Sequence, residues 1–150
     1  MLDYIKGMDI SSLDELEKLG AKFYDHGKEG DLIQILKDYG TNYIRLRIWN
    51  DPKSPDGKPY GAGNTDYETM LRMAKRVKAA GLGFLLDFHY SDFWADPGKQ
   101  RKPKAWADYN ADQLEQAVYD FTKEILNRLA QENIVPDMVP VSYTHLRAHE

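Results

Sequence analysis

Cysteine is absent from this sequence of 150 residues, and so are a long apolar run and an excess of positive charge. The lack of cysteine excludes a disulfide framework and a thiolate metal site, but it leaves the compartment open. No apolar stretch approaches the length that spans a membrane. The formal net charge is −4, with acidic and basic residues interspersed, so the charge pattern indicates no nucleic-acid partner.

The first residues also lack the features of a signal peptide. The segment from Met1 to Lys6 has neither a basic region nor the apolar region that should follow it. We therefore expect either that the protein is made without a leader or that Met1 is not the original start. The localisation stays open.

The composition that is present is that of a globular domain. Hydrophobic residues make up 42% and charged residues 29% of the chain, which is long enough to bury a core as one domain. The one bias is toward aromatic side chains, with ten tyrosines and three tryptophans that concentrate in the predicted loops. This placement predicts a ligand with flat apolar faces.

The hydrophobic patterns predict a β-α-β-α-β-α-β order. Gly40 and Gly81 each end a predicted helix and precede a predicted strand, which fits a repeated βα unit. A small extra extended piece is predicted over 21–24. The main predicted elements, in order, are strand 4–10, helix 12–20, helix 31–39, strand 42–49, helix 65–81, strand 83–86, helix 110–129 and strand 137–139.

Three of these helices begin with the pattern of a capping box. In this motif a polar side chain and a Glu or Gln three positions later satisfy backbone N–H groups at the helix start. We expect each pair to cap its own helix. The pairs are Ser12 with Glu15, Thr65 with Glu68, and Asn110 with Gln113.

The predicted order fits part of a (β/α)8 barrel. Such a barrel needs about 250 residues, so these elements would form its first three βα units and the beginning of a fourth. A complete doubly wound sheet of four strands would also fit the length, but it places a glycine-rich turn after its first strand, and Asp9 to Ser12 is not glycine-rich. We therefore predict the N-terminal half of a barrel, as one partial domain over residues 1–139.

Charged side chains lie near the carboxyl ends of the predicted strands, where barrel enzymes keep their chemistry. Asp87 and His89 share one face of a strand, and Arg45 and Arg47 share one face of another. The arginines could line a site, or they could be core residues paired with Asp9 or Asp87. Asp87 and His89 could also be metal ligands, but no third ligand has a supporting spacing, so no metal site is predicted.

Six segments together resemble one family. Any one of them alone, such as Asp-Phe-His, would be weak, but the combination runs from about Tyr4 to Val139. The segments are KGMDISSL (6–13), YIRLRIWNDP (43–52), YGAGNT (60–65), LLDFHYSDFWADPGKQ (85–100), KPKAW (102–106) and PDMV (136–139). They resemble the endo-β-1,4-galactanases of glycoside hydrolase family 53.

The resemblance implies a TIM barrel that hydrolyses internal β-1,4-galactosidic bonds in the galactan side chains of pectin, without a cofactor. It implies a retaining mechanism with two carboxylates about 5 Å apart. A glutamate after strand four is the acid/base in such enzymes, and one after strand seven is the nucleophile. An arginine on strand two and a histidine on strand three support this pair, and Arg45 and His89 match those positions. The complete enzyme is expected to be a monomer that binds galactan, and relatives are often secreted.

Aromatic and polar side chains near the strand ends are the candidate substrate contacts. Trp94, Tyr90 and Trp49 could stack on a galactose ring or could pack in the core, and packing is favoured for Trp106. Polar members could bind sugar hydroxyls or tie loops together. The predicted substrate-binding residues are Asp9, Trp49, Asn64, Asp87, Tyr90, Asp92 and Trp94.

The sequence departs from the family pattern after Val139. The family continues through Gln-Val-Gly-Asn-Glu, whereas this chain has Thr144 where that glutamate belongs, and Pro140 cannot donate to a strand ladder. Residues 140–150 are interpreted as an artefact or a change of reading frame. Both catalytic glutamates are then missing, and we predict that this chain alone is inactive.

Two other interpretations remain open at this point. One is a non-catalytic galactan-binding protein that keeps half of a substrate groove, and the other is an unrelated α/β fold with its site in the same loops. A half-barrel also leaves strand edges unpaired, so the isolated chain is expected to be aggregation-prone or poorly folded.

Overall fold

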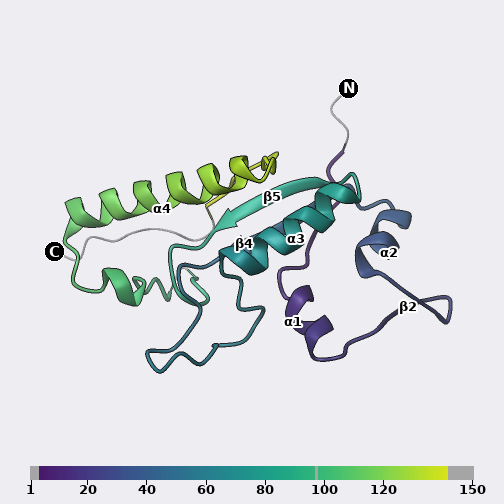
Figure 1. The fold of residues 1–150 in the computed structure, drawn as a ribbon, viewed down its shortest axis with the longest axis horizontal. Coiled ribbons are helices and arrows are strands. Elements are labelled where there is room, and N and C mark those ends of the chain that lie inside the picture. Colours follow the sequence, from purple (N-terminus) through teal and green to yellow (C-terminus); the bar gives the residue numbers. More distant parts are fainter. Residues whose placement is uncertain (1–3, 97, 142–150) are drawn as a thin grey trace.

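The computed structural model describes residues 4–96 and 98–141 of the chain. Its main sheet has three parallel strands in the order β1-β4-β5. The strands point the same way, so their carboxyl ends meet at one end of the sheet (Figure 1). Their bounds are β1 (Gly7–Asp9), β4 (Tyr43–Ile48) and β5 (Gly83–Phe88).

The predicted fourth strand lies parallel to β5, although it pairs only at isolated positions. The bridges are Leu85–Met138 and Phe88–Val141. The Phe88 N–H donates to the Pro140 carbonyl oxygen at 3.3 Å. Pro140 has no N–H of its own, and it joins this pairing through its carbonyl alone.

Four α-helices and one 3-10 helix connect the strands within the described residues. Gly20, Gly40 and Gly81 follow α1, α2 and α3 with φ of 88°, 89° and 74°, so the predicted glycine ends are confirmed. No helix in the described ranges is both long and apolar enough to cross a membrane. The bounds are α1 (Leu13–Lys18), α2 (Leu32–Asp38), α3 (Tyr67–Ala79), η1 (Lys104–Trp106) and α4 (Ala111–Gln131).

One of the three predicted capping boxes is confirmed. The Asn110 side chain accepts from the Gln113 N–H, and the Gln113 side chain accepts from the Asn110 N–H. The prediction for Ser12 with Glu15 is wrong, because Ser12 makes no side-chain cap and Glu15 instead bonds to a distant loop.

The capping box predicted for Thr65 with Glu68 is also wrong by one residue. Asp66 is the N-cap of α3, and its Oδ1 accepts from the Thr69 N–H at 2.9 Å. The Thr65 hydroxyl is buried, and none of the described residues pairs with it. Aspartate is as good an N-cap as threonine or better, and Asp66 has the extended backbone that a cap requires.

A hairpin precedes α2, where only an extended piece at 21–24 was predicted. It consists of β2 (Phe23–Asp25) and β3 (Lys28–Gly30), which pair antiparallel and project away from the main sheet (Figure 1). His26 and Gly27 form the turn with φ of 46° and 78°. Positive φ at both central residues matches the twist of a two-residue hairpin, although histidine is not the usual signal for it.

Alternate residues of β4 and β5 form the core against the helices. On the opposite face Tyr43, Arg45 and Leu85 are only half-buried. The alternation predicted for 42–49 is therefore confirmed, and the polar residues lie on the face away from the core. The fully buried strand residues are Ile44, Leu46, Ile48, Phe84, Leu86 and Phe88, which cluster with Met70 and Val77 of α3 and with Ile125 and Leu129 of α4.

Candidate active site

An ion-pair network joins the carboxyl ends of β1, β4 and β5. Asp87 is fully buried, and its Oδ2 accepts hydrogen bonds from Arg45 Nε at 2.8 Å and from Arg45 Nη2. Arg45 Nη1 also lies 3.4 Å from Asp9 Oδ2. The register brings this about, because Asp9 and Arg45 are partners across adjacent strands. One arginine therefore links two carboxylates, and this pairing offsets the cost of burying charge.

His89 extends the network into the interior. The side chain is almost fully buried, and its Nε2 lies 3.2 Å from Asp87 Oδ2, where an N–H on Nε2 donates to the carboxylate. Nδ1 is buried, and no described residue offers it a hydrogen-bond partner.

Arg47 is the buried cation of this site. Only 3% of the residue is exposed, and burial lowers the pKa of its guanidinium, whereas nearby Asp9 and Asp87 act in the opposite direction. Its Cζ lies 3.8 Å from the ring centroid of Trp94 and 5.4 Å from that of Trp49. A cation at this distance from an aromatic face is attracted to it. Arg47 therefore packs against one face of the Trp94 indole and helps to hold the ring in place.

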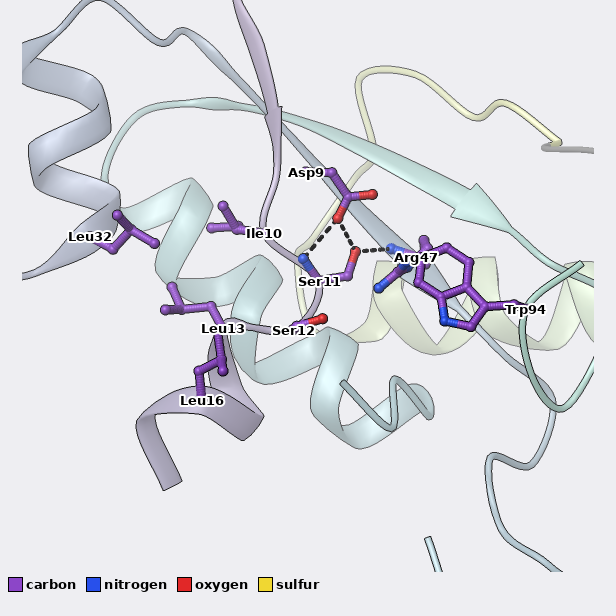
Figure 2. A pocket seen from close by; sticks show the side chains of 9 residues that line it. All are labelled: Asp9, Ile10, Ser11, Ser12, Leu13, Leu16, Leu32, Arg47 and Trp94. Atoms are coloured by element: carbon purple, nitrogen blue, oxygen red, sulfur yellow. Dashed lines mark hydrogen bonds between the residues drawn. The ribbon is translucent and has the colours of Figure 1, made fainter. Parts of the chain in front are cut away.

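Ser11 connects the end of β1 to this arginine. Its Oγ donates to Asp9 Oδ1 at 2.7 Å and accepts from the Arg47 backbone N–H at 2.9 Å (Figure 2). A pocket of about 440 Å³ opens beside these residues, with Arg47 and Trp94 on one side. Trp94 is 45% exposed, so it presents an aromatic surface to a ligand. The apolar side of the pocket is lined by Ile10, Leu13, Leu16 and Leu32.

Trp49, another predicted contact, lies behind Trp94 rather than at the surface. It is fully buried, with its ring centroid 5.8 Å from that of Trp94 and 5.5 Å from that of Phe93. Its Nε1–H is buried and has no partner among the described residues. Trp49 therefore packs behind the exposed rings of Phe93 and Trp94.

The polar groups of Asp92 and Asn64 hold loops together. Asp92 accepts from the Asp51 N–H at 3.0 Å and from the Lys104 N–H at 2.8 Å. Asn64 accepts from the Gly61 N–H at 2.7 Å and donates to Glu15 Oε1 at 2.7 Å. The loop-tying alternative is thus observed for both, and their contact with substrate stays a prediction.

Tyr90 turns away from the pocket toward α4. Its hydroxyl lies 2.7 Å from the Thr122 hydroxyl, and its ring stacks on Phe88 with centroids 5.7 Å apart. Burial raises the pKa of the Tyr90 hydroxyl, and the bond to Thr122 partly opposes this. Trp106 is likewise buried against Phe121. These contacts are those of core residues, so nothing in the geometry supports Tyr90 as a sugar contact.

Sequence reasoning did not single out Ser11 or the tertiary role of Glu15. The spacing of Asp9 and Ser11 is that of a local side-chain-to-backbone turn, and the Ser11 N–H indeed donates to Asp9 Oδ1 at 2.9 Å. The local turn between Asp9 and Ser11 could therefore have been predicted from the sequence. The bonds from Gly63 N–H and Asn64 to Glu15 join segments far apart in the chain, and no local sequence pattern predicts them.

The parallel βα units and the polar network at the strand ends are those of part of an α/β barrel. In the described part of the chain, no three His, Asp or Glu side chains are placed to hold a metal ion. The family model described as glycosyl hydrolase family 53 matches residues 5–143, and the chain belongs to that family.

The relatives confirm a partial TIM barrel. The endo-β-1,4-galactanase of Bacillus subtilis (strain 168) is 45% identical over 140 residues, which are 93% of this chain and 33% of that protein. The arabinogalactan endo-β-1,4-galactanase of Cellvibrio japonicus (strain Ueda107) is 38% identical over 90% of this chain and 34% of its own length. The GH53 catalytic domain of Ignisphaera aggregans has a TM-score of 0.88 at 51% identity, over 93% of this chain and 39% of its own.

The chain therefore spans about a third of the length of the curated relatives that it matches. Residues 142–150 lie outside the described residues. The predicted departure from the family after Val139, with Thr144 at the position of the glutamate, accordingly stays a prediction. So does the division of the chain into 1–139 and 140–150.

Proposed function

We propose that this chain builds part of the substrate groove of a glycoside hydrolase that cleaves internal β-1,4-galactosidic bonds of galactan. The observation that carries this proposal is the exposed Trp94 indole, which rests on buried Arg47 at the carboxyl ends of the strands. An accessible ring with polar neighbours fits a pyranose, which has apolar faces and a polar rim. The names of the relatives, which are endo-β-1,4-galactanases, support galactan as the polysaccharide.

We infer that the complete enzyme retains configuration, through two carboxylates about 5 Å apart. The family resemblance assigns these to glutamates after strands four and seven, outside the network of Asp9, Arg45 and Asp87. Arg45 and His89, joined through Asp87, then act as positioning residues for that pair. A cation beside the nucleophile keeps it ionised, because an opposite charge lowers the pKa of a carboxylate.

Among the other predicted contacts, the geometry best supports Asp9. Its side chain is 28% exposed and lines the pocket beside Trp94, so it can accept a hydrogen bond from a sugar hydroxyl. Each remaining candidate is engaged with protein groups or buried, and its part in binding is indirect in this proposal. These residues are Trp49, Asn64, Asp87, Tyr90 and Asp92.

A non-catalytic galactan-binding role is the second candidate. The described residues at the strand ends provide an aromatic platform and a pocket, but none of them is a glutamate. A saturable change of tryptophan fluorescence when β-1,4-galactotetraose is added to the 150-residue chain would support this role. An inert fragment would show no such change.

The decisive experiment joins residues 4–139 to the rest of the barrel of the Ignisphaera relative and assays this joined barrel on β-1,4-galactan. We expect the joined barrel to release galacto-oligosaccharides and the 150-residue chain to release none. Arg45→Met in the joined barrel should lower kcat about 100-fold with little change in KM, whereas Arg72→Met, on the outer surface of α3, should change neither. A joined barrel that folds but leaves galactan intact would overturn the proposal. Cleavage of galactan by the 150-residue chain would contradict the prediction that this chain alone is inactive.

A further inference from the structure

A second pocket, of about 640 Å³, lies between the loop that follows β4 and the loop that follows β5. Tyr60 and Trp94 provide aromatic walls, and Trp94 is shared with the first pocket. The remaining walls are strongly basic, although the whole chain carries a net charge of −4. The basic lining residues are Lys99, Arg101, Lys102 and Lys104.

Two of these four cations are used by the protein itself. Lys104 Nζ lies 2.7 Å from Asp51 Oδ2 and 3.4 Å from Asp92 Oδ2, and Lys102 Nζ donates to the Tyr109 carbonyl oxygen at 2.6 Å. Burial lowers the pKa of Lys104, but its bonds to these two carboxylates outweigh burial and raise that pKa overall. Both lysines therefore fix the shape of the pocket.

The other two cations are available to a ligand. Lys99 and Arg101 are exposed, and in the part of the chain that the structure describes their side chains make no hydrogen bond or ion pair. Among the described residues, neither carboxylate of the pocket forms an ion pair with them: Asp92 is paired with Lys104, and Asp96 accepts from the Gly98 N–H at 2.8 Å. The pocket thus offers two unpaired positive charges next to an aromatic surface.

We propose that this basic pocket binds a carboxylate-bearing sugar, a uronate residue of the polysaccharide adjacent to the galactan segment that Trp94 contacts. The inference rests on the proposed function, which places a saccharide on Trp94. A guanidinium presents a planar fork that matches a carboxylate, and charge-assisted hydrogen bonds of this kind are stronger than those to neutral hydroxyls. Tyr60 and Trp94 supply the apolar surface that a sugar ring needs.

The test measures binding of trigalacturonate by titration calorimetry to the joined barrel with its two catalytic glutamates changed to glutamine, called here the inactive joined barrel. The variant Lys99→Gln/Arg101→Gln should bind about tenfold more weakly. The control Lys28→Gln/Lys123→Gln removes the same charge from exposed positions on β3 and α4, and it should bind like the unchanged inactive joined barrel. Raising the salt concentration from about 50 to about 300 mM should weaken binding, because exposed charges are screened.

Three results would overturn the uronate site. The first is no binding of trigalacturonate to the unchanged inactive joined barrel, and the second is an equal loss in both double variants. The third is displacement by inorganic phosphate at equal concentration, which would indicate a general anion site. Titration with neutral β-1,4-galactotetraose separates this inference from the proposed function. The Lys99→Gln/Arg101→Gln variant should bind that ligand unchanged. If the inactive joined barrel binds trigalacturonate but never galactotetraose, the proposed function fails and the uronate site stands.

Discussion

Trp94 stays nearly half exposed although it contacts the fully buried Trp49. Arg47 explains this position, because its buried guanidinium faces both rings and lies closer to Trp94. A platform for a sugar has to be rigid before the sugar arrives, since ordering a side chain on binding costs affinity. At the residue scale, the arginine is thus expected to matter for binding without touching the ligand.

We expect Arg47→Met in the inactive joined barrel to raise the Kd for β-1,4-galactotetraose about fivefold, because a cation–π contact of about 1 kcal/mol is lost. Trp94→Ala should weaken binding as well, and the double variant should lose less than the sum of the two single losses. Titration calorimetry measures all three. Tyr119→Phe is the control and should bind normally, since Tyr119 is exposed on α4 and lines neither pocket. Additive losses would contradict the supporting role of Arg47.

Gly63 is required by its backbone and by its surroundings. It has a φ of 103°, and a Cβ there would lie 2.9 Å from the Ser11 carbonyl oxygen and 3.1 Å from Ser12 Cα. Both contacts are with backbone atoms, which cannot move aside easily. Gly57 has a similar φ of 80° but has open space around it. Comparing alanine at the two positions therefore separates the cost of backbone strain from the cost of steric overlap.

Gly63→Ala should lower the free energy of unfolding of the joined barrel by about 3 kcal/mol, because overpacking adds to the strain of positive φ. Gly57→Ala should cost only about 1 kcal/mol, from the strain alone. Urea denaturation followed by tryptophan fluorescence measures both. Equal losses would show that Gly63 is not in tight contact with Ser11 and Ser12, which follow β1.

At the scale of elements, Asp137 fastens the chain after α4 to the start of β5. Its Oδ2 accepts from the Phe84 N–H and from Lys78 Nζ, both at 2.7 Å, and its own N–H donates to the Phe84 carbonyl oxygen at 2.8 Å. Burial raises the pKa of Asp137, but the hydrogen bonds from Lys78 and Phe84 outweigh burial, so the pKa is lowered overall. The ionised form is therefore the one that stabilises the fold.

A carboxyl with a lowered folded-state pKa contributes stability that is complete above its unfolded pKa, about 3.9, and is lost as the pH falls through the folded value. We therefore expect Asp137→Asn to lower the stability of the joined barrel at pH 7 and to have progressively less effect as the pH falls below that unfolded pKa. Urea denaturation across this pH range is the measurement. Asp108→Asn, at an exposed position, is the control and should leave the profile unchanged. A constant difference between wild type and Asp137→Asn at every pH would contradict the assigned ion pair.

At the scale of the whole molecule, the described sheet has two open edges. β1 pairs with β4 alone, and residues 138–141 pair with β5 alone. Apolar side chains are exposed at both, since Met8 is 46%, Val139 46% and Val141 51% exposed. Unpaired edges with apolar side chains favour association between chains.

We expect the 150-residue chain to form soluble or insoluble aggregates at micromolar concentration, as seen by light scattering after size exclusion. Val139→Lys/Val141→Lys should reduce this association, because charges on an edge strand oppose pairing. Tyr119→Lys removes an equally exposed side chain from α4, away from both edges, and should leave the association unchanged. A soluble monomer with a cooperative thermal transition would contradict the expectation.

The order of the elements and the family were readable from the sequence. Helices and strands reveal themselves through the periodicity of neighbouring residues, and the caps at Asp31 and Asn110 act within a few positions. The buried alternation of Ile44, Leu46 and Ile48 was equally local. The turn at His26 and Gly27 escaped prediction because such two-residue turns are usually signalled by Asn-Gly or Asp-Gly, and here histidine precedes the glycine.

Which side chains meet was decided only by the tertiary structure. The sequence placed Asp87, His89 and Arg45 at the strand ends, but the register of parallel strands and the paths of the loops set Arg47 beneath Trp94 and turned Tyr90 toward α4. For the same reason the Glu15 carboxylate accepts a hydrogen bond from the loop after β4 and does not cap the start of its own helix. Such contacts join residues far apart in the chain, and their geometry depends on packing that no local pattern encodes.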